Sequence, residues 1–237
     1  FGNECEQLGH NLMDHHFGVG AGGEYEGFED QYYNSGRRPN GIYIPRFRNT
    51  NAHTMQKDYV RGFGYQGGAG RGRGSSWEGI GVQLKEARSE PGKWSMGVGS
   101  WGEHLPYFEN KVALNKNKKD KYGLPTLDID CEFKDNERAM RKDMQASAIE
   151  MLTAAGLKNI HGYDSAPPPG HCIHEMGTAR MGKDPKTSVL NGFNQVHAAK
   201  NVFVTDGACM ASSSCVNPSI TYMALTARAC NHAVSEL

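Results

Sequence analysis

Glycine constrains this chain more than any other residue type. It supplies 30 of the 237 residues, nearly twice the usual share of roughly 7%, and nine of the twenty positions from 62 to 81. Each glycine in a helix interior costs about 1 kcal/mol relative to alanine, so the 62–81 segment should not be helical. Much of the chain should instead be loop, tight turn or backbone that another segment approaches closely.

The charges of the chain balance. With 26 basic and 26 acidic residues, it has no net charge when its histidines are neutral. A protein that coats nucleic acid or an anionic membrane carries an excess of positive charge, so we expect no nucleic-acid partner. Arg71–Gly74 (RGRG) resembles an RNA-binding tail, but two arginines in a neutral chain favour a loop. No apolar run approaches the ~18 residues that a membrane helix needs.

The start of the chain and its cysteines give weaker information. Residue 1 is Phe1 and no signal-peptide pattern follows, so we expect a processed or truncated chain whose upstream half lies elsewhere. The six cysteines show neither a C-x-x-C pair nor the spacing of zinc ligands, and the redox compartment stays open. His171 and His174 flank Cys172, but no third ligand stands at a suitable spacing, so we expect no metal site.

Alternating apolar residues predict an antiparallel sheet over roughly residues 41–133. The last strand should be half-buried, and a charged loop with a glycine turn should precede it from Lys116. The predicted strands are a run at Ile42, Ile44 and Phe47, followed by 80–88, 105–114 and 126–133.

Two helices are expected, one after the sheet and one at the C-terminal end. Asn136 can cap the first, whose apolar stripe runs up to Gly156. A short buried strand at 201–205 precedes the second helix, which should begin near Ser219 with Pro218 at a permitted first-turn position.

The dinucleotide-binding pattern G-x-G-x-x-G occurs three times, beginning at Gly18, Gly62 and Gly97. Its function requires a buried strand before it and a helix after it, so that the pyrophosphate meets a helix N-terminus. The sequence predicts both flanks for none of the three, and we expect no nucleotide site at any of them.

From residue 167 on, three pieces of sequence point to chemistry together. They are His174 in a glycine-flanked turn (HEMGTARMG), a strand that ends at Asp206 and Gly207 (NVFVTDG), and a helix start that presents Asn217, Ser219 and Thr221 (VNPSIT). A helix N-terminus carries roughly +0.5 of an elementary charge and free N–H donors. Such an end suits an anionic ligand or a ring that gains negative charge.

This constellation resembles the C-terminal part of the glucose–methanol–choline (GMC) oxidoreductases, flavoenzymes that oxidise alcohols, and most of all their gluconate- and glucoside-dehydrogenase branch. Leu8–His15 (LGHNLMDH) resembles an internal segment of the same family. The resemblance implies an α+β fold: an antiparallel-sheet substrate domain with helices, plus the C-terminal strand and helix of a Rossmann-like FAD-binding domain whose N-terminal half is absent from this chain. It implies a connecting segment at 1–40, a substrate-binding domain at 41–166 and the C-terminal part of the FAD-binding domain at 167–237.

The resemblance also implies FAD as the cofactor and gives roles to residues. His174 would take the proton of the substrate hydroxyl, and Asn217 would orient that hydroxyl. Asp206 and Gly207 would face the ribityl–pyrophosphate part of FAD. The flavin ring would lie against Asn217, Pro218, Ser219 and Thr221, where the helix dipole favours negative charge.

The substrate and the partners follow from the same resemblance. We expect a sugar or glucoside hydroxyl, which aromatic rings among the glycines can stack on, although the same rings can simply pack in a sheet. The rings are Trp77, Trp94, Trp101, Tyr107 and Phe108. The expected partners are a chain or segment carrying the N-terminal FAD-binding half, a small companion subunit and a cytochrome c acceptor, in the periplasm; an oxygen-using oxidase stays open. The alternative is a non-catalytic, glycine-rich β-sheet module that binds carbohydrate or serves in assembly.

Overall fold

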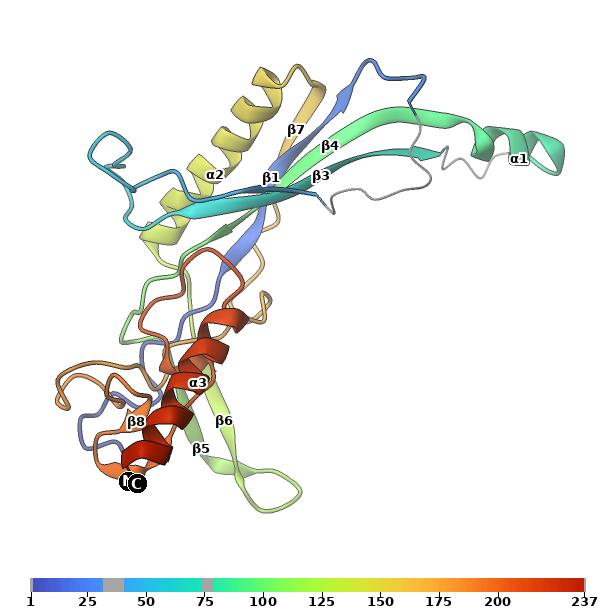
Figure 1. The fold of residues 1–237 in the computed structure, drawn as a ribbon. Coiled ribbons are helices and arrows are strands. Elements are labelled where there is room, and N and C mark those ends of the chain that lie inside the picture. The colour runs from blue at the N-terminus through green and yellow to red at the C-terminus, as the bar shows by residue number, and fades with distance from the viewer. Residues whose placement is uncertain (1, 32–40, 74–78, 237) are drawn as a thin grey trace.

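The computed structural model describes residues 2–31, 41–73 and 79–236, which form a sheet layered against a helix and, below it, a body of loops, short strands and a second long helix (Figure 1). The sheet has five antiparallel strands in the order β2-β3-β4-β1-β7. They are β1 (His16–Tyr25), β2 (Ile42–Ile44), β3 (Phe63–Arg73), β4 (Pro91–Gly102) and β7 (Lys158–Asp164). The fold is α+β and mostly antiparallel, which confirms the predicted class.

Helix α2 (Asp135–Ala154) covers one face of this sheet (Figure 1). Phe63, Tyr65 and Val98 point from the strands toward Met140 and Met144 of the helix, and all five side chains are almost fully buried. Each contributes roughly 1.5–3 kcal/mol relative to exposure. This core confirms the helix and apolar stripe predicted around 136–156.

The cap of α2 differs from the prediction. Glu137, fully buried, accepts the backbone N–H of Lys134 at 2.9 Å and that of Leu105 at 3.1 Å. The predicted cap, Asn136, instead accepts the N–H of Val60 at 2.8 Å. The helix begins at Asp135, two residues earlier than a cap at Asn136 implies, so Asn136 lies inside the first turn and cannot act as its N-cap.

The glycine patterns lie inside strands. The three G-x-G-x-x-G matches fall in β1, β3 and β4, so none opens a helix. A Cβ added to Gly20 would lie 2.0 Å from the Val98 carbonyl oxygen. The backbone of β4 can therefore approach β1 this closely only because residue 20 has no side chain. Strand β1 lies within the segment 1–40, where we predicted only a connection; residues 1 and 32–40 of that segment lie outside the described residues.

The 80–88 segment, predicted as a strand, contains helix α1 (Val82–Ser89). Its residues are mostly good helix formers. The alternation of apolar and polar residues that suggested a strand does not mark a buried face, because Ile80 and Val82 are exposed.

The 105–130 segment forms a protruding hairpin, separate from the main sheet, made of β5 (Lys111–Lys119) and β6 (Pro125–Asp130). The strand predicted at 105–114 therefore begins later and continues through the lysines predicted as a loop. The predicted strand at 126–133 is largely exposed, with Leu127 and Ile129 facing solvent, since the described chain places no layer over that face.

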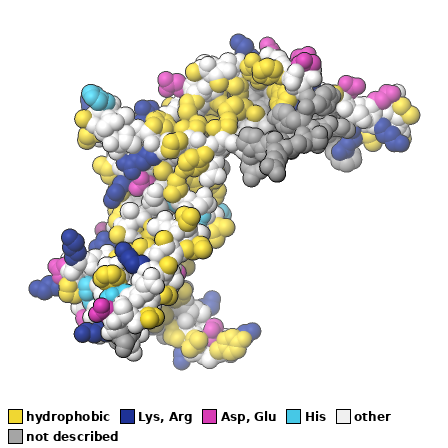
Figure 2. Space-filling model, in the orientation of Figure 1, with side chains coloured by type: hydrophobic (Ala, Val, Ile, Leu, Met, Phe, Trp, Pro, Cys, Tyr) yellow, Lys and Arg dark blue, Asp and Glu magenta, His cyan; other side chains and the backbone are white. Residues whose placement is uncertain are grey.

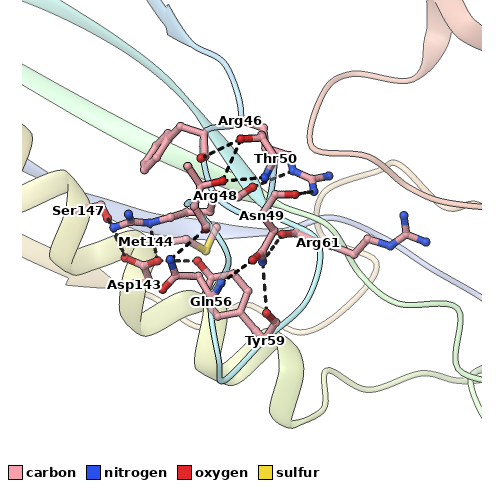
Figure 3. Close-up of polar contacts among 12 residues, drawn as sticks. Arg46, Arg48, Asn49, Thr50, Gln56, Tyr59, Arg61, Asp143, Met144 and Ser147 are labelled. Atoms are coloured by element: carbon pink, nitrogen blue, oxygen red, sulfur yellow. Dashed lines mark hydrogen bonds and ion pairs between the residues drawn. The ribbon is translucent and has the colours of Figure 1, made fainter. Parts of the chain in front are cut away.

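A polar network anchors the loop after β2 to α2 (Figure 3). Arg48 donates from Nε and Nη2 to the two carboxylate oxygens of Asp143, at 2.9 and 3.1 Å. The hydroxyls of Tyr59 and Ser147 donate to the same carboxylate. Burial opposes the charge of Asp143, but these donors leave its pKa below the usual value.

The C-terminal body contains β8 (Gln195–Val196), β9 (Ala199–Phe203), a 3-10 turn η1 (Gly207–Cys209) and helix α3 (Ser219–Glu236). The predicted strand at 201–205 is thus found two residues earlier, and it is partly exposed where we expected burial. Helix α3 begins as predicted, but Ile220, Met223 and Val234 of its apolar stripe are exposed. Hydrophobic side chains accordingly lie on the surface over the lower body as well as over the sheet (Figure 2). Among the described helices, none has the length and apolar character to cross a bilayer.

Candidate active site

The structure brings His174 and Asn217 together, although 43 residues separate them in the chain. The Nδ2 atom of Asn217 lies 3.4 Å from Nε2 of His174. His174 belongs to the irregular segment that follows β7, and Asn217 stands directly before α3. The two predicted residues therefore share one surface, where the sheet meets the C-terminal body.

Strand β3 orients the Asn217 amide. The Nε2 atom of Gln66 donates to Oδ1 of Asn217 at 3.4 Å. Because the amide oxygen is the acceptor in that contact, the amide nitrogen faces His174. Asn217 is exposed and the following Pro218 is buried. The backbone is therefore fixed by packing at this point, while the Asn217 amide stays accessible to solvent.

The other side of the His174 ring faces His15. The two Nδ1 atoms lie 2.8 Å apart, a hydrogen-bond distance. His15 is 1% exposed, and its Nε2 lies 3.0 Å from the carbonyl oxygen of Ser213. Burial lowers the pKa of His15 more than any other influence, while the Ser213 carbonyl raises it and His174 lowers it.

The Asp14 carboxylate holds the backbone around both rings. Its Oδ1 accepts the N–H groups of His15 and His174, at 2.7 and 3.3 Å. Its Oδ2 accepts those of Gly170 and Cys172, at 2.8 and 3.3 Å. A segment without regular secondary structure is thereby fixed to the residues just before β1 by one side chain.

Cys172 completes the group. Its Sγ lies 3.5 Å from Nδ1 of His174, and burial raises the pKa of the thiol to about 12, so it stays protonated. One donor atom each of His15, Cys172 and His174 lie within 4.8 Å of one another. The sequence spacing showed no third possible metal ligand near Cys172, whereas the fold brings His15 there from 157 residues away. The prediction that the chain binds no metal stays a prediction.

The residues predicted for FAD surround a cavity and the start of α3. Asp206 and Gly207 line a cavity of about 470 Å³ together with Asp14, Gly170 and Glu175. Asp206 caps η1 by accepting the N–H of Ala208 at 2.9 Å. The turn lies close to the His174 segment, since a Cβ on Gly207 would lie 2.5 Å from the Glu175 carbonyl oxygen.

The second turn of α3 is joined to the residue just before Asp206. Thr226 Oγ1 donates to the carbonyl oxygen of Thr205 at 3.1 Å. Ser219 and Thr221 are exposed on the first turn. The first N–H groups of a helix lack intrahelical acceptors, although that of Thr221 donates to the Pro218 carbonyl oxygen at 3.0 Å. A helix start of this kind, together with the glycine turn that lines the cavity, suits a site for a flavin and its phosphates.

The structure does not gather the predicted aromatic residues. Trp94 and Trp101 lie seven residues apart on β4, roughly 23 Å at strand spacing, and Trp77 lies outside the described residues. Tyr107 donates to the buried Glu137, and Phe108 stacks on His10 with ring centroids 3.9 Å apart. Among the described rings of this set, Trp101 lies beside Cys172, and packing explains most of the others.

Sequence reasoning missed Asp14, His15, Gln66 and Ser213 as parts of the site. The signal for the first two was present in the LGHNLMDHH segment, but a polar stretch gives no sign that its histidines are buried. Gln66 and Ser213 reach the site only through the pairing of β3 and the path of the chain before α3, which no local pattern encodes.

Comparisons with known proteins identify the family of the chain. The family model described as "GMC oxidoreductase" matches residues 106–226. The chain is similar to the 2-methyl-1,2-propanediol dehydrogenase of Mycolicibacterium austroafricanum, with 36% identity over 54% of this chain and 23% of that protein. It is similar to the fructose dehydrogenase large subunit of Gluconobacter japonicus, with 25% identity over 99% of this chain and 42% of that protein. Similarity to the gluconate 2-dehydrogenase flavoprotein of Pantoea cypripedii is 30% identity over 62% of this chain and 25% of that protein. The chain thus spans between about a quarter and two fifths of the length of these relatives.

Proposed function

The chain belongs to the GMC oxidoreductase family. From that membership and the geometry of its site, we propose that it is the substrate-side and C-terminal part of an FAD-dependent dehydrogenase. This enzyme would oxidise an alcohol group of a sugar or glucoside. The observation that supports this most is the convergence of His174 Nε2 and the Asn217 amide, 3.4 Å apart on an exposed surface beside the start of α3.

The two side chains supply what alcohol oxidation requires from a protein. A substrate hydroxyl that contacts both side chains can donate its proton to His174 Nε2 and accept a hydrogen bond from the Asn217 amide nitrogen. FAD, when bound, would accept the hydride from the carbon that bears this hydroxyl, leaving a carbonyl. Gln66 fixes the amide, and Asp14 and His15 fix the imidazole, so both groups are oriented before substrate arrives.

Asp206, Gly207, Pro218, Ser219 and Thr221 would hold the cofactor on this side. The turn at Asp206 would face the ribityl and phosphate groups, and the exposed first turn of α3 would face the ring. The site is open, and the exposed apolar residues of α3 fit a further layer. We propose that a segment or chain carrying the N-terminal half of the FAD-binding domain covers it.

The relatives support the substrate class and the assembly. The fructose dehydrogenase relative, which aligns over nearly the whole chain, is a large subunit by name. These names support a sugar substrate and further subunits. From the resemblance to the family we also propose a small companion subunit, a cytochrome c acceptor and a periplasmic location.

Anaerobic flavin reduction tests this function. The assembled protein is purified with its flavin, mixed with fructose, gluconate or a glucoside without oxygen, and followed by its visible absorbance. We expect one of these alcohols to bleach the flavin. Asn217→Ala should slow bleaching about tenfold or more, which corresponds to about 1.4 kcal/mol of lost transition-state stabilisation, whereas Asn117→Ala, on the exposed hairpin, should not. A colourless protein that binds a sugar unaided would contradict the proposal and favour a non-catalytic module.

A further inference from the structure

We propose that His15 is a positioning residue that holds the proton of His174 on Nδ1 and so leaves His174 Nε2 free to accept a proton. This inference rests on the proposed function, in which His174 Nε2 takes the hydroxyl proton. It concerns a residue that lies outside the predicted His/Asn pair and touches neither substrate nor Asn217.

The position of one proton on His15 follows from its surroundings. His15 Nε2 lies 3.0 Å from the carbonyl oxygen of Ser213. A carbonyl oxygen can only accept, so this ring nitrogen carries hydrogen. The ring is 1% exposed, which disfavours a second proton and the charge it would bring. In a neutral imidazole with hydrogen on Nε2, Nδ1 is a bare acceptor.

The proton on His174 follows from that of His15. The two Nδ1 atoms lie 2.8 Å apart, and one hydrogen must lie between them. Because His15 Nδ1 is the acceptor, His174 Nδ1 is the donor. A neutral His174 then has a bare Nε2.

The opposite side of His174 agrees with this assignment. Asn217 Nδ2, which can only donate, lies 3.4 Å from His174 Nε2. Its hydrogen can point at a bare nitrogen but would oppose an N–H. The contacts from Ser213 through His15 and His174 to Asn217 are thus consistent. Cys172 Sγ, 3.5 Å from His174 Nδ1, can accept weakly from the same hydrogen.

Asp14 sets the spacing of the two rings. Its Oδ1 accepts the backbone N–H of both His15 and His174. The hydrogen bond between the rings therefore spans two segments that one carboxylate already holds, and little reorganisation is needed to keep it.

Two substitutions of nearly equal size separate the role of the Nδ1 acceptor from general packing. In His15→Asn, the amide oxygen can occupy the place of Nδ1 and accept from His174. In His15→Gln, the longer amide reaches the Ser213 carbonyl but leaves no acceptor at the Nδ1 place. We expect His15→Gln to lower kcat about 100-fold, the low end for losing a general base, with KM changed little, and His15→Asn to retain kcat within about tenfold of the parent. His53→Gln, at an exposed histidine outside the site, should leave both constants unchanged.

Nitrogen-15 NMR of the histidine rings gives a readout that does not depend on activity. In the unsubstituted flavoprotein, the resonances should show His174 protonated at Nδ1 and bare at Nε2, with the reverse pattern in His15. In His15→Gln, the His174 hydrogen should move to Nε2 in part or in full. A wild-type spectrum with hydrogen on His174 Nε2 would overturn the inference, as would equal kcat values for the Asn and Gln variants.

The outcomes also separate this inference from the proposed function. If alcohol oxidation persists in His174→Ala, the proposed function is wrong, and the NMR pattern still decides the proton position. If His174→Ala abolishes oxidation while His15→Gln does not change kcat, only the positioning role is wrong.

Discussion

The Asp14 carboxylate determines more of the site's backbone than any other described side chain. Four backbone N–H groups point at its two oxygens, from both sides of the junction between the sheet and the C-terminal body. It lies next to His15 in the chain and opposite His174 in space, so its hydrogen bonds and the histidine pair support each other. Its importance was invisible in the sequence, because an aspartate in a polar segment is normally solvated.

Replacing one oxygen of that carboxylate tests this view. In Asp14→Asn an NH₂ group, itself a donor, replaces a carboxylate oxygen that accepted backbone N–H groups, so we expect a loss of about 1–3 kcal/mol in the free energy of unfolding. Hydrogen exchange at the amides of Gly170, Cys172 and His174 should quicken. Asp184→Asn, at an exposed turn, should change stability by less than about 0.5 kcal/mol. Unaltered exchange at all three amides would contradict the role of Asp14.

The helices and strands show which local sequence patterns predict the folded structure correctly. Helices α2 and α3 could be predicted because both have periodic apolar residues. In addition, α2 has a charged first turn and α3 has a proline at its start, and both signals act within one or two turns of helix. Strand β1 could not be predicted, because glycine has no side chain to alternate and Gly20 is needed for close contacts with Val98 on β4 and Tyr163 on β7, which only the folded chain shows. The structure of the α1 segment and the burial of the β5–β6 hairpin were predicted wrongly, because apolar residues that are exposed were taken to be buried.

The glycine contacts in the sheet give a prediction with a matched control. Gly20→Ala places a Cβ 2.0 Å from the Val98 carbonyl oxygen, so β1 and β4 must separate. We expect a loss of about 1–3 kcal/mol in unfolding free energy, the usual cost of overpacking. Gly70→Ala on β3, where a Cβ meets nothing within 4 Å, should be neutral or slightly stabilising. Equal denaturation midpoints for the two variants would show that close backbone approach does not explain the glycines.

At the scale of the whole molecule, three buried histidines lie at the adjoining ends of β1 and β4, and one of them, His15, contacts the C-terminal body. Burial is the main cause that lowers the pKa of His15, His16 and His104. Between the folded and unfolded pKa values the unfolded chain binds more protons, so stability falls as the pH decreases. We expect the unfolding free energy to fall from about pH 7 to pH 5, measured by denaturant titration at fixed ionic strength. Rising stability over that range would mean that these histidines are charged in the folded protein.

The central claim is that His174 takes the proton of the alcohol. It is tested most directly by the rate at which a saturating sugar substrate reduces the bound flavin in the assembled protein, compared between the parent, His174→Ala and the neighbouring exposed control His171→Ala. We expect His174→Ala to lower this rate at least ~100-fold while flavin content and His171→Ala stay near the parent. A His174→Ala protein that keeps its flavin and reduces it within a few-fold of the parent rate would contradict the account.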